Sequence, residues 1–269
     1  MLDGAFTLYR RQFASLFLTA LLPQLPLIVL LGVYYGFLGA FADASGTEPT
    51  LSGGMLVAVG LAMLVLAPLA AVGSATAVGG VTFQVARAYT GTPVTTGDAL
   101  RRGLQRSLAM MGAYIVVFIL SMFGILAFFI GFLVVWISAF AVAPAVVLER
   151  RGPIESISRS WALIKGAWGE VFLVVFIAGM IATLPGSAVG MMAMIGGLVL
   201  SHGDPDKMMA IQGVGQVISQ VARTLTIPFS LGVTVLLYYD RRVRTEALDV
   251  QMMAESLPAT PAPAAPGWG

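Results

Sequence analysis

The sequence predicts an all-α protein, a polytopic bundle of six transmembrane helices. Three observations predict this fold class: 58% of the 269 residues are hydrophobic, only 10% are charged, and the mean hydropathy is +0.91. A soluble domain carries about 25% charged residues. The charged side chains are too few to cover a soluble protein of this size. The composition therefore excludes an ordinary soluble enzyme, and it also excludes a disordered chain, which is poor in hydrophobic residues.

Long stretches without charge define the first two predicted helices. A helix needs about 20 residues to cross a hydrocarbon layer about 30 Å thick. The first stretch, Ala14–Gly39, has 26 residues, which is too long for the apolar core of a signal peptide. We therefore expect it to remain as a transmembrane helix. The stretch Pro49–Ala86 predicts one further long helix, beginning near Met55.

The third charge-free stretch is too long for a single crossing. Ser107–Leu148 has 42 residues, which would make a helix roughly 63 Å long. We therefore expect two crossings joined by a tight turn near Gly124–Gly131. The two remaining crossings are Val171–Gly203 and the pair Met208–Ala222 and Thr224–Tyr239, which Arg223 interrupts.

The basic residues indicate how these helices are oriented. Without Arg223, thirteen of the fifteen Lys and Arg residues fall before the first helix, between helices two and three, between helices four and five, or after helix six. Lys207 lies on the opposite side. The positive-inside rule places the basic side and both termini in the cytoplasm. We therefore expect a multi-pass protein of a bacterial inner membrane.

Three predicted helices follow an amphipathic, basic segment: Leu2–Phe13, Thr96–Arg106 and Pro153–Trp168. The first and third segments align without gaps at an offset of 155 residues, which pairs Phe6 with Trp161. This pattern predicts three units, each an interfacial elbow helix followed by a transmembrane hairpin. The alternative is that the segments are ordinary basic flanks, which any polytopic protein has at its cytoplasmic helix starts.

Two segments resemble a known family. One is the run from Pro144 to Trp168, and the other is Leu237-Tyr-Tyr-Asp-Arg-Arg-Val-Arg-Thr-Glu-Ala-Leu-Asp. Together they resemble the bacterial six-helix family named after the membrane domain of glycerophosphoryl diester phosphodiesterase, over most of Met1–Val250. Ala247 departs from the family's ending, where glycine is more frequent. The resemblance implies the six-helix fold, but not phosphodiesterase activity, which in the namesake resides in a soluble catalytic barrel.

Residues that could perform catalysis are scarce. The chain has no cysteine and a single histidine, His202. It shows no nucleophile–base pair, no paired carboxylates within a span and no phosphate-binding loop. We therefore expect a protein that is not an enzyme and that holds no cofactor or metal. The arginines form no broad basic face with interleaved aromatic residues, so we do not expect binding to nucleic acid.

Arg223 is the candidate polar site within the membrane. A charge inside the bilayer is costly and indicates function by default. The alternative is that Lys207–Arg223 lies along the outer interface, which would leave Thr224–Tyr239, only about 24 Å of helix, to span. The residues Gln212, Gln216, Ser219, Gln220 and Arg223 form a polar stripe, and the Gly186-x-x-x-Gly190 spacing permits close helix contact.

Basic and aromatic residues at the cytoplasmic boundary are candidates for contact with anionic lipid head groups. The paired tyrosines before the last arginines predict a membrane anchor, and Asp240 could pair with an arginine of an elbow helix. The candidates are Arg10, Arg11, Arg101, Arg102, Trp161, Lys165, Trp168, Tyr238, Tyr239, Arg241 and Arg242.

These observations predict one integral membrane domain over residues 1–250 and a disordered Pro/Ala-rich cytoplasmic tail over residues 251–269. Our first hypothesis is a scaffold or membrane partner of envelope proteins or lipids, with a protein partner encoded nearby. The second is a small transporter or permease subunit for a lipid or apolar substrate, which prolines inside the spans and Arg223 favour. The third, an accessory role in phospholipid head-group turnover, depends on the resemblance alone.

Overall fold

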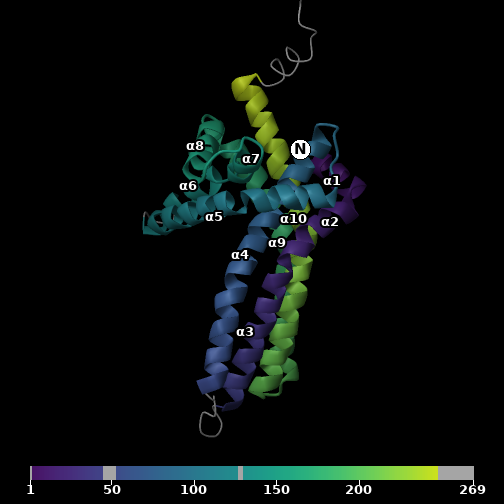
Figure 1. The fold of residues 1–269 in the computed structure, drawn as a ribbon, viewed down its shortest axis with the longest axis vertical. Coiled ribbons are helices and arrows are strands. Elements are labelled where there is room, and N and C mark those ends of the chain that lie inside the picture. Colours follow the sequence, from purple (N-terminus) through teal and green to yellow (C-terminus); the bar gives the residue numbers. More distant parts are fainter. Residues whose placement is uncertain (1, 45–52, 127–129, 248–269) are drawn as a thin grey trace, which may run out of the picture.

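The computed structural model describes residues 2–44, 53–126 and 130–247, and the part it describes is helical without strands. The elements are drawn in Figure 1. They are α1 (Leu2–Arg11), α2 (Phe13–Leu21), η1 (Leu22–Gln24), α3 (Leu25–Ala44), α4 (Gly53–Tyr89), α5 (Thr96–Leu126), α6 (Ile130–Ser138), α7 (Val142–Val147), α8 (Pro153–Ile164), α9 (Trp168–Leu200) and α10 (Pro205–Glu246). The tail expected to be disordered, residues 251–269, lies outside the described residues.

The prediction of an all-α bundle with six membrane-spanning helices is confirmed. Within the described ranges, six segments are long and apolar enough to cross a membrane. The third ends at Leu126 and the fourth begins at Ile130, and the middle of the turn expected at Gly124–Gly131, residues 127–129, lies outside the described residues. The segments are Phe13–Leu38, Gly53–Tyr89, Thr96–Leu126, Ile130–Val147, Trp168–Leu200 and Lys207–Glu246.

The long helices fall into two groups. In Figure 1, α3, α4, α9 and α10 run alongside one another, whereas α5 extends across them, and α6 lies beside it. The helices α1, α7 and α8 gather at one end of the four-helix group, together with the beginning of α5 and the end of α10. We call this end the basic end, because thirteen of the fifteen Lys and Arg residues lie on these elements, in the loops beside them or, for Arg87, in the last turn of α4.

The basic end also contains most of the buried core. One buried cluster joins α4, α5 and α7 through residues such as Ala75, Met110 and Val146. A second joins α2, α4 and α10, with Leu16 fully buried among Val85 and Val235. The opposite parts of α4 and α9 leave many large apolar side chains exposed, as expected where a helix faces lipid.

Two of the three expected elbow helices are separate elements. The chain bends at Gln12, between α1 and α2, and at Gly166, where φ is +82°, between α8 and α9. The third expectation, a separate elbow at Thr96–Arg106, is wrong, because these residues are the first turns of α5 and continue into it. Neither a proline nor a residue with positive φ interrupts α5.

Helices α4 and α5 cross at glycines, and this crossing positions the start of α5. A Cβ added to Gly79 would lie 3.1 Å from the Cα of Gly103, and one added to Gly103 would lie 2.7 Å from the Gly80 amide nitrogen and overlap the Thr76 carbonyl. The two backbones therefore approach as closely as glycine alone allows.

Candidate functional site: a charged cluster at the basic end

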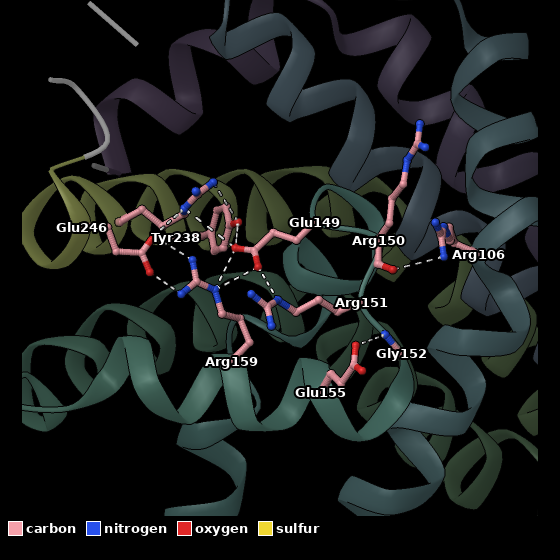
Figure 2. Close-up of polar contacts among 10 residues, drawn as sticks. Arg106, Glu149, Arg150, Arg151, Gly152, Glu155, Arg159, Tyr238 and Glu246 are labelled. Carbon is pink, nitrogen blue, oxygen red and sulfur yellow. Dashed lines mark hydrogen bonds and ion pairs between the residues drawn. The ribbon is translucent and has the colours of Figure 1, made fainter. Parts of the chain in front are cut away.

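A network of charged side chains joins the two segments that carry the family resemblance. Glu149 follows α7, and its Oε1 accepts a hydrogen bond from the Tyr238 hydroxyl of α10 over 2.6 Å. The Arg159 Nε of α8 donates to the same carboxylate at 2.8 and 2.9 Å. Arg151 donates to it at 2.6 Å. Figure 2 shows these side chains converging on Glu149 from three directions.

Arg159 connects this carboxylate to a second one. Its Nη2 donates to Oε2 of Glu246 over 2.8 Å, and its Nη1 donates to the other oxygen, so the contact is bidentate. Arg242 lies one turn before Glu246 and also donates to it, at 3.1 Å. Bidentate arginine–carboxylate pairs add geometric specificity to charge. The end of α10 is therefore held to α8 at a fixed register.

Local sequence explains why these groups meet. Tyr238, Arg242 and Glu246 are spaced four residues apart, which puts them on one face of α10. Helix α8 begins with Pro153 at its first position, and the Glu155 carboxylate accepts a hydrogen bond from the Gly152 amide over 3.2 Å. These features fix where α8 starts, and Arg159 is then carried to the side that faces α10.

The surroundings of Glu149 and Arg159 favour their charged forms. Burial by itself would raise the pKa of Glu149, but hydrogen bonds from Tyr238, Arg151 and Arg159 outweigh it and hold the pKa below its ordinary value. The hydrogen bond to Glu246 is the main reason that the pKa of Arg159 is raised, despite burial. Both side chains are largely buried, with exposed fractions of 12% and 13%. The network is a satisfied ion cluster, which suits it to holding helices together.

Two of the predicted lipid-contacting residues are instead buried. Tyr238 is fully buried, and Arg241 is 6% exposed and donates to the Leu163 carbonyl over 3.0 Å. The expectation that they contact head groups must be corrected, because their faces of α10 pack against α8 and the loop after α7. Arg242 belongs to the network, and Tyr239 stacks on Tyr89 with ring centroids 5.3 Å apart.

The expected pairing of Asp240 is also corrected. Its carboxylate lies 2.9 Å from Arg244 on its own helix, rather than beside an arginine of an elbow helix. The tie between α10 and α8 comes instead from Glu246 and Arg241. Glu170 lies in the first turn of α9, and its carboxylate is 3.9 Å from Arg241 and from Arg244.

The other predicted head-group residues remain accessible. Arg10, Arg11, Arg101 and Lys165 are exposed, and the described structure gives none of them an ion pair. Arg102 is half-buried. Trp161 is exposed and Trp168 half-buried, and their rings meet edge to face at 5.2 Å.

Arg223 lies halfway along a continuous helix. It is sixteen residues after Lys207 and sixteen before Tyr239, which is about 24 Å from each along α10. No break separates the two segments that the sequence suggested. The side chain is exposed and passes over Gly186 of α9, where a Cβ would overlap it.

The polar stripe on α10 packs against the small residues of α9. The Ser219 hydroxyl donates to the Gly186 carbonyl over 2.6 Å, and the Thr226 hydroxyl donates to the Ala182 carbonyl over 2.6 Å. Gly190 lies beside Ser219. Interhelical hydrogen bonds of this kind hold membrane helices together. Gln216 also lies beside Gly190, and Gln212 lies beside Gly197. These members of the stripe therefore pack against α9, and Arg223 is its one charged member.

Sequence reasoning missed Glu149, Arg159 and Glu246 as site residues, although all three lie in the segments that carry the resemblance. A carboxylate set among arginines at the end of an apolar stretch was the available signal. Comparisons with protein-family models, curated proteins and solved structures gave no match. The family resemblance therefore stays a prediction.

Proposed function

We propose that this chain is a non-catalytic integral membrane protein of a bacterial inner membrane, which acts as a scaffold or membrane partner of envelope proteins or lipids. In this proposal the basic end faces the cytoplasm and contacts anionic head groups. The observation that supports it most is that some cations at this end form ion pairs whereas others remain exposed without one. The Glu149 network engages Arg159 and Arg242, while Arg10, Arg101 and Lys165 stay exposed on three separate segments.

Such an arrangement suits lipid binding for an electrostatic reason. Each exposed basic residue near an anionic membrane surface contributes about 1 kcal/mol of attraction. The exposed ring of Trp161, four residues before Lys165, is also typical of an interfacial segment. The buried core and the ion network beneath would keep this surface rigid.

The test is the lipid and protein content of native membrane patches extracted with the chain. Wild type is compared with a variant that carries glutamine at Arg10, Arg11, Arg101 and Lys165. We expect anionic lipids to be enriched around wild type and to fall toward the bulk composition around the variant. A stoichiometric crosslinked protein partner would support the scaffold role. Equal lipid compositions and no partner would contradict the proposal.

Arg223 favours a second candidate, a small transporter or permease subunit for a lipid or apolar substrate. A cation midway along a span is a functional signal, and prolines lie inside the same set of helices: Pro68 in α4, Pro185 in α9 and Pro228 in α10. Arg223→Ala distinguishes the two. It should abolish substrate movement in a transporter and leave the recovery of a scaffold's partner unchanged. A partner that hydrolyses glycerophosphodiesters would support the third candidate, an accessory role in head-group turnover.

A further inference from the structure

Three arginines gather beside the Glu149 network without an acidic partner. Arg102 and Arg106 lie one turn apart on α5, and Arg150 lies in the loop between α7 and α8. Arg102 is repelled electrostatically by both of the others. In the described structure no ion pair reaches any of the three, and the acidic groups on the surrounding elements are engaged elsewhere: Asp98 with Thr95, Glu155 with the Gly152 amide, and Glu149 with Arg151, Arg159 and Tyr238.

Backbone carbonyls occupy only part of the hydrogen-bonding capacity of this cluster. Arg102 donates one hydrogen bond, from Nη2 to the Val147 carbonyl over 3.0 Å, and Arg106 donates one, from Nη1 to the Arg150 carbonyl over 3.5 Å. Each guanidinium has five N–H donors. The Nε of Arg102 is buried without a hydrogen-bond partner, and a buried unpaired donor is costly. The Arg102 Cζ lies over the ring of Phe83, 5.7 Å from the ring centroid, within the range of a cation–π contact.

Arg150 adds a backbone observation. Its φ is +59°, a conformation that disfavours a side chain and that glycine usually provides after a helix. Its side chain is exposed, and Figure 2 shows that it points away from Glu149. Its backbone carbonyl accepts the hydrogen bond from Arg106. An arginine is therefore held at a glycine-like position, and its exposed guanidinium extends away from the Glu149 carboxylate.

We propose that Arg102, Arg106 and Arg150 bind a phosphate group. Phosphate carries the charge that would offset their repulsion, and its oxygens match the planar fork of arginine in bidentate geometry. The inference rests on the proposed function, because it names the chemical group that the basic end recognises. The phosphate belongs either to the head group of an anionic phospholipid or to a soluble phosphate compound.

Arg150→Gly provides the sharpest variant, since it removes the charge and the side chain while relieving the backbone at φ +59°. Arg102→Lys keeps the positive charge but removes the planar guanidinium that can donate two parallel hydrogen bonds to one phosphate. Arg244→Gln is the matched control, because it removes one charge from the same end of the molecule, where Arg244 is 56% exposed. Binding is measured in detergent by native mass spectrometry, with phosphatidic acid, phosphatidylcholine and inorganic phosphate as separate probes, alongside the melting temperature.

We expect wild type to bind phosphatidic acid more tightly than phosphatidylcholine. Arg150→Gly and Arg102→Lys should each lose affinity about tenfold, with no lower melting temperature for Arg150→Gly. Competition by inorganic phosphate would identify a soluble phosphate site, and its absence would identify a lipid site; both support the inference. Equal losses in Arg150→Gly and Arg244→Gln would overturn the site and leave the proposed function standing. Failure of wild type to bind either phosphate probe would overturn both.

Discussion

At the residue scale, Glu149 is the group on which the charged network depends. It accepts hydrogen bonds from Tyr238, Arg151 and Arg159 and has an exposed fraction of only 12%. Removing one partner of a largely buried ion cluster leaves the remaining charges uncompensated. We expect Glu149→Gln to lower the free energy of unfolding by about 2–4 kcal/mol, measured by thermal or denaturant unfolding in detergent.

Glu155→Gln is the control for this prediction. Glu155 is exposed and accepts one hydrogen bond from the Gly152 amide, so its loss affects only the start of α8. We expect a decrease of about 1 kcal/mol or less. Equal stability of the two variants would contradict a structural role for the Glu149 network.

The lowered pKa of Glu149 also predicts a pH dependence. The unfolded chain binds this proton more readily than the folded protein, so the contribution of Glu149 is fully present above the ordinary pKa of 4.5 and is lost as the pH falls through the lower pKa of the folded protein. The stability advantage of wild type over Glu149→Gln should therefore shrink below that pH. Melting temperatures of both proteins, measured above and below this pH, would show the decrease. A difference in melting temperature that stays constant with pH would contradict the prediction.

The sequence predicts residue types better than residue partners. It marked the tyrosines and arginines at the end of α10 as a group, but it assigned Tyr238 and Arg241 to lipid. Their partners, Glu149 and Leu163, are 89 and 78 residues away in the chain. Which face of a helix meets a neighbour depends on packing across such separations, and a charge pattern along one segment does not contain that information.

At the element scale, the α4–α5 crossing sets the direction of α5. A methyl group at Gly103 would meet backbone atoms of Thr76 and Gly80, which have no flexible end to move aside. We expect Gly103→Ala to destabilise the fold by about 1–3 kcal/mol. Gly97→Ala on the same helix meets only the Thr95 hydroxyl, at 3.9 Å, and should be neutral or slightly stabilising. Unfolding of both variants in detergent tests this, and indistinguishable behaviour would show that the crossing can relax.

Charge-free stretches predicted the helices well, because length and hydropathy are local properties. The same reasoning placed a break near Arg106, where α5 is continuous. A basic amphipathic segment is compatible with a separate elbow and with the first turns of a long helix. What separates α1 and α8 from the helices that follow them is a local backbone change at Gln12 and at Gly166, and α5 has no equivalent.

At the scale of the whole molecule, the separation of charge organises the protein. The basic end gathers α1, α8, the start of α5 and the end of α10, and Lys207 lies at the far end of α10 (Figure 1). The side chains of two acidic residues, Asp43 and Glu48, and those of the predicted tail lie outside the described part of the chain. The proposed scaffold and lipid-binding role requires the basic end to face the cytoplasm, where cytoplasmic partners are available.

The most direct test of this orientation is thiol labelling in intact cells. The chain has no cysteine, so single substitutions can be made in an otherwise unreactive background. Arg10→Cys reports on the basic end and Lys207→Cys on the opposite end, and both side chains are exposed. We predict that a membrane-impermeant maleimide applied from outside labels Lys207→Cys and reaches Arg10→Cys only after the cells are permeabilised. Labelling of Arg10→Cys in intact cells would contradict the account.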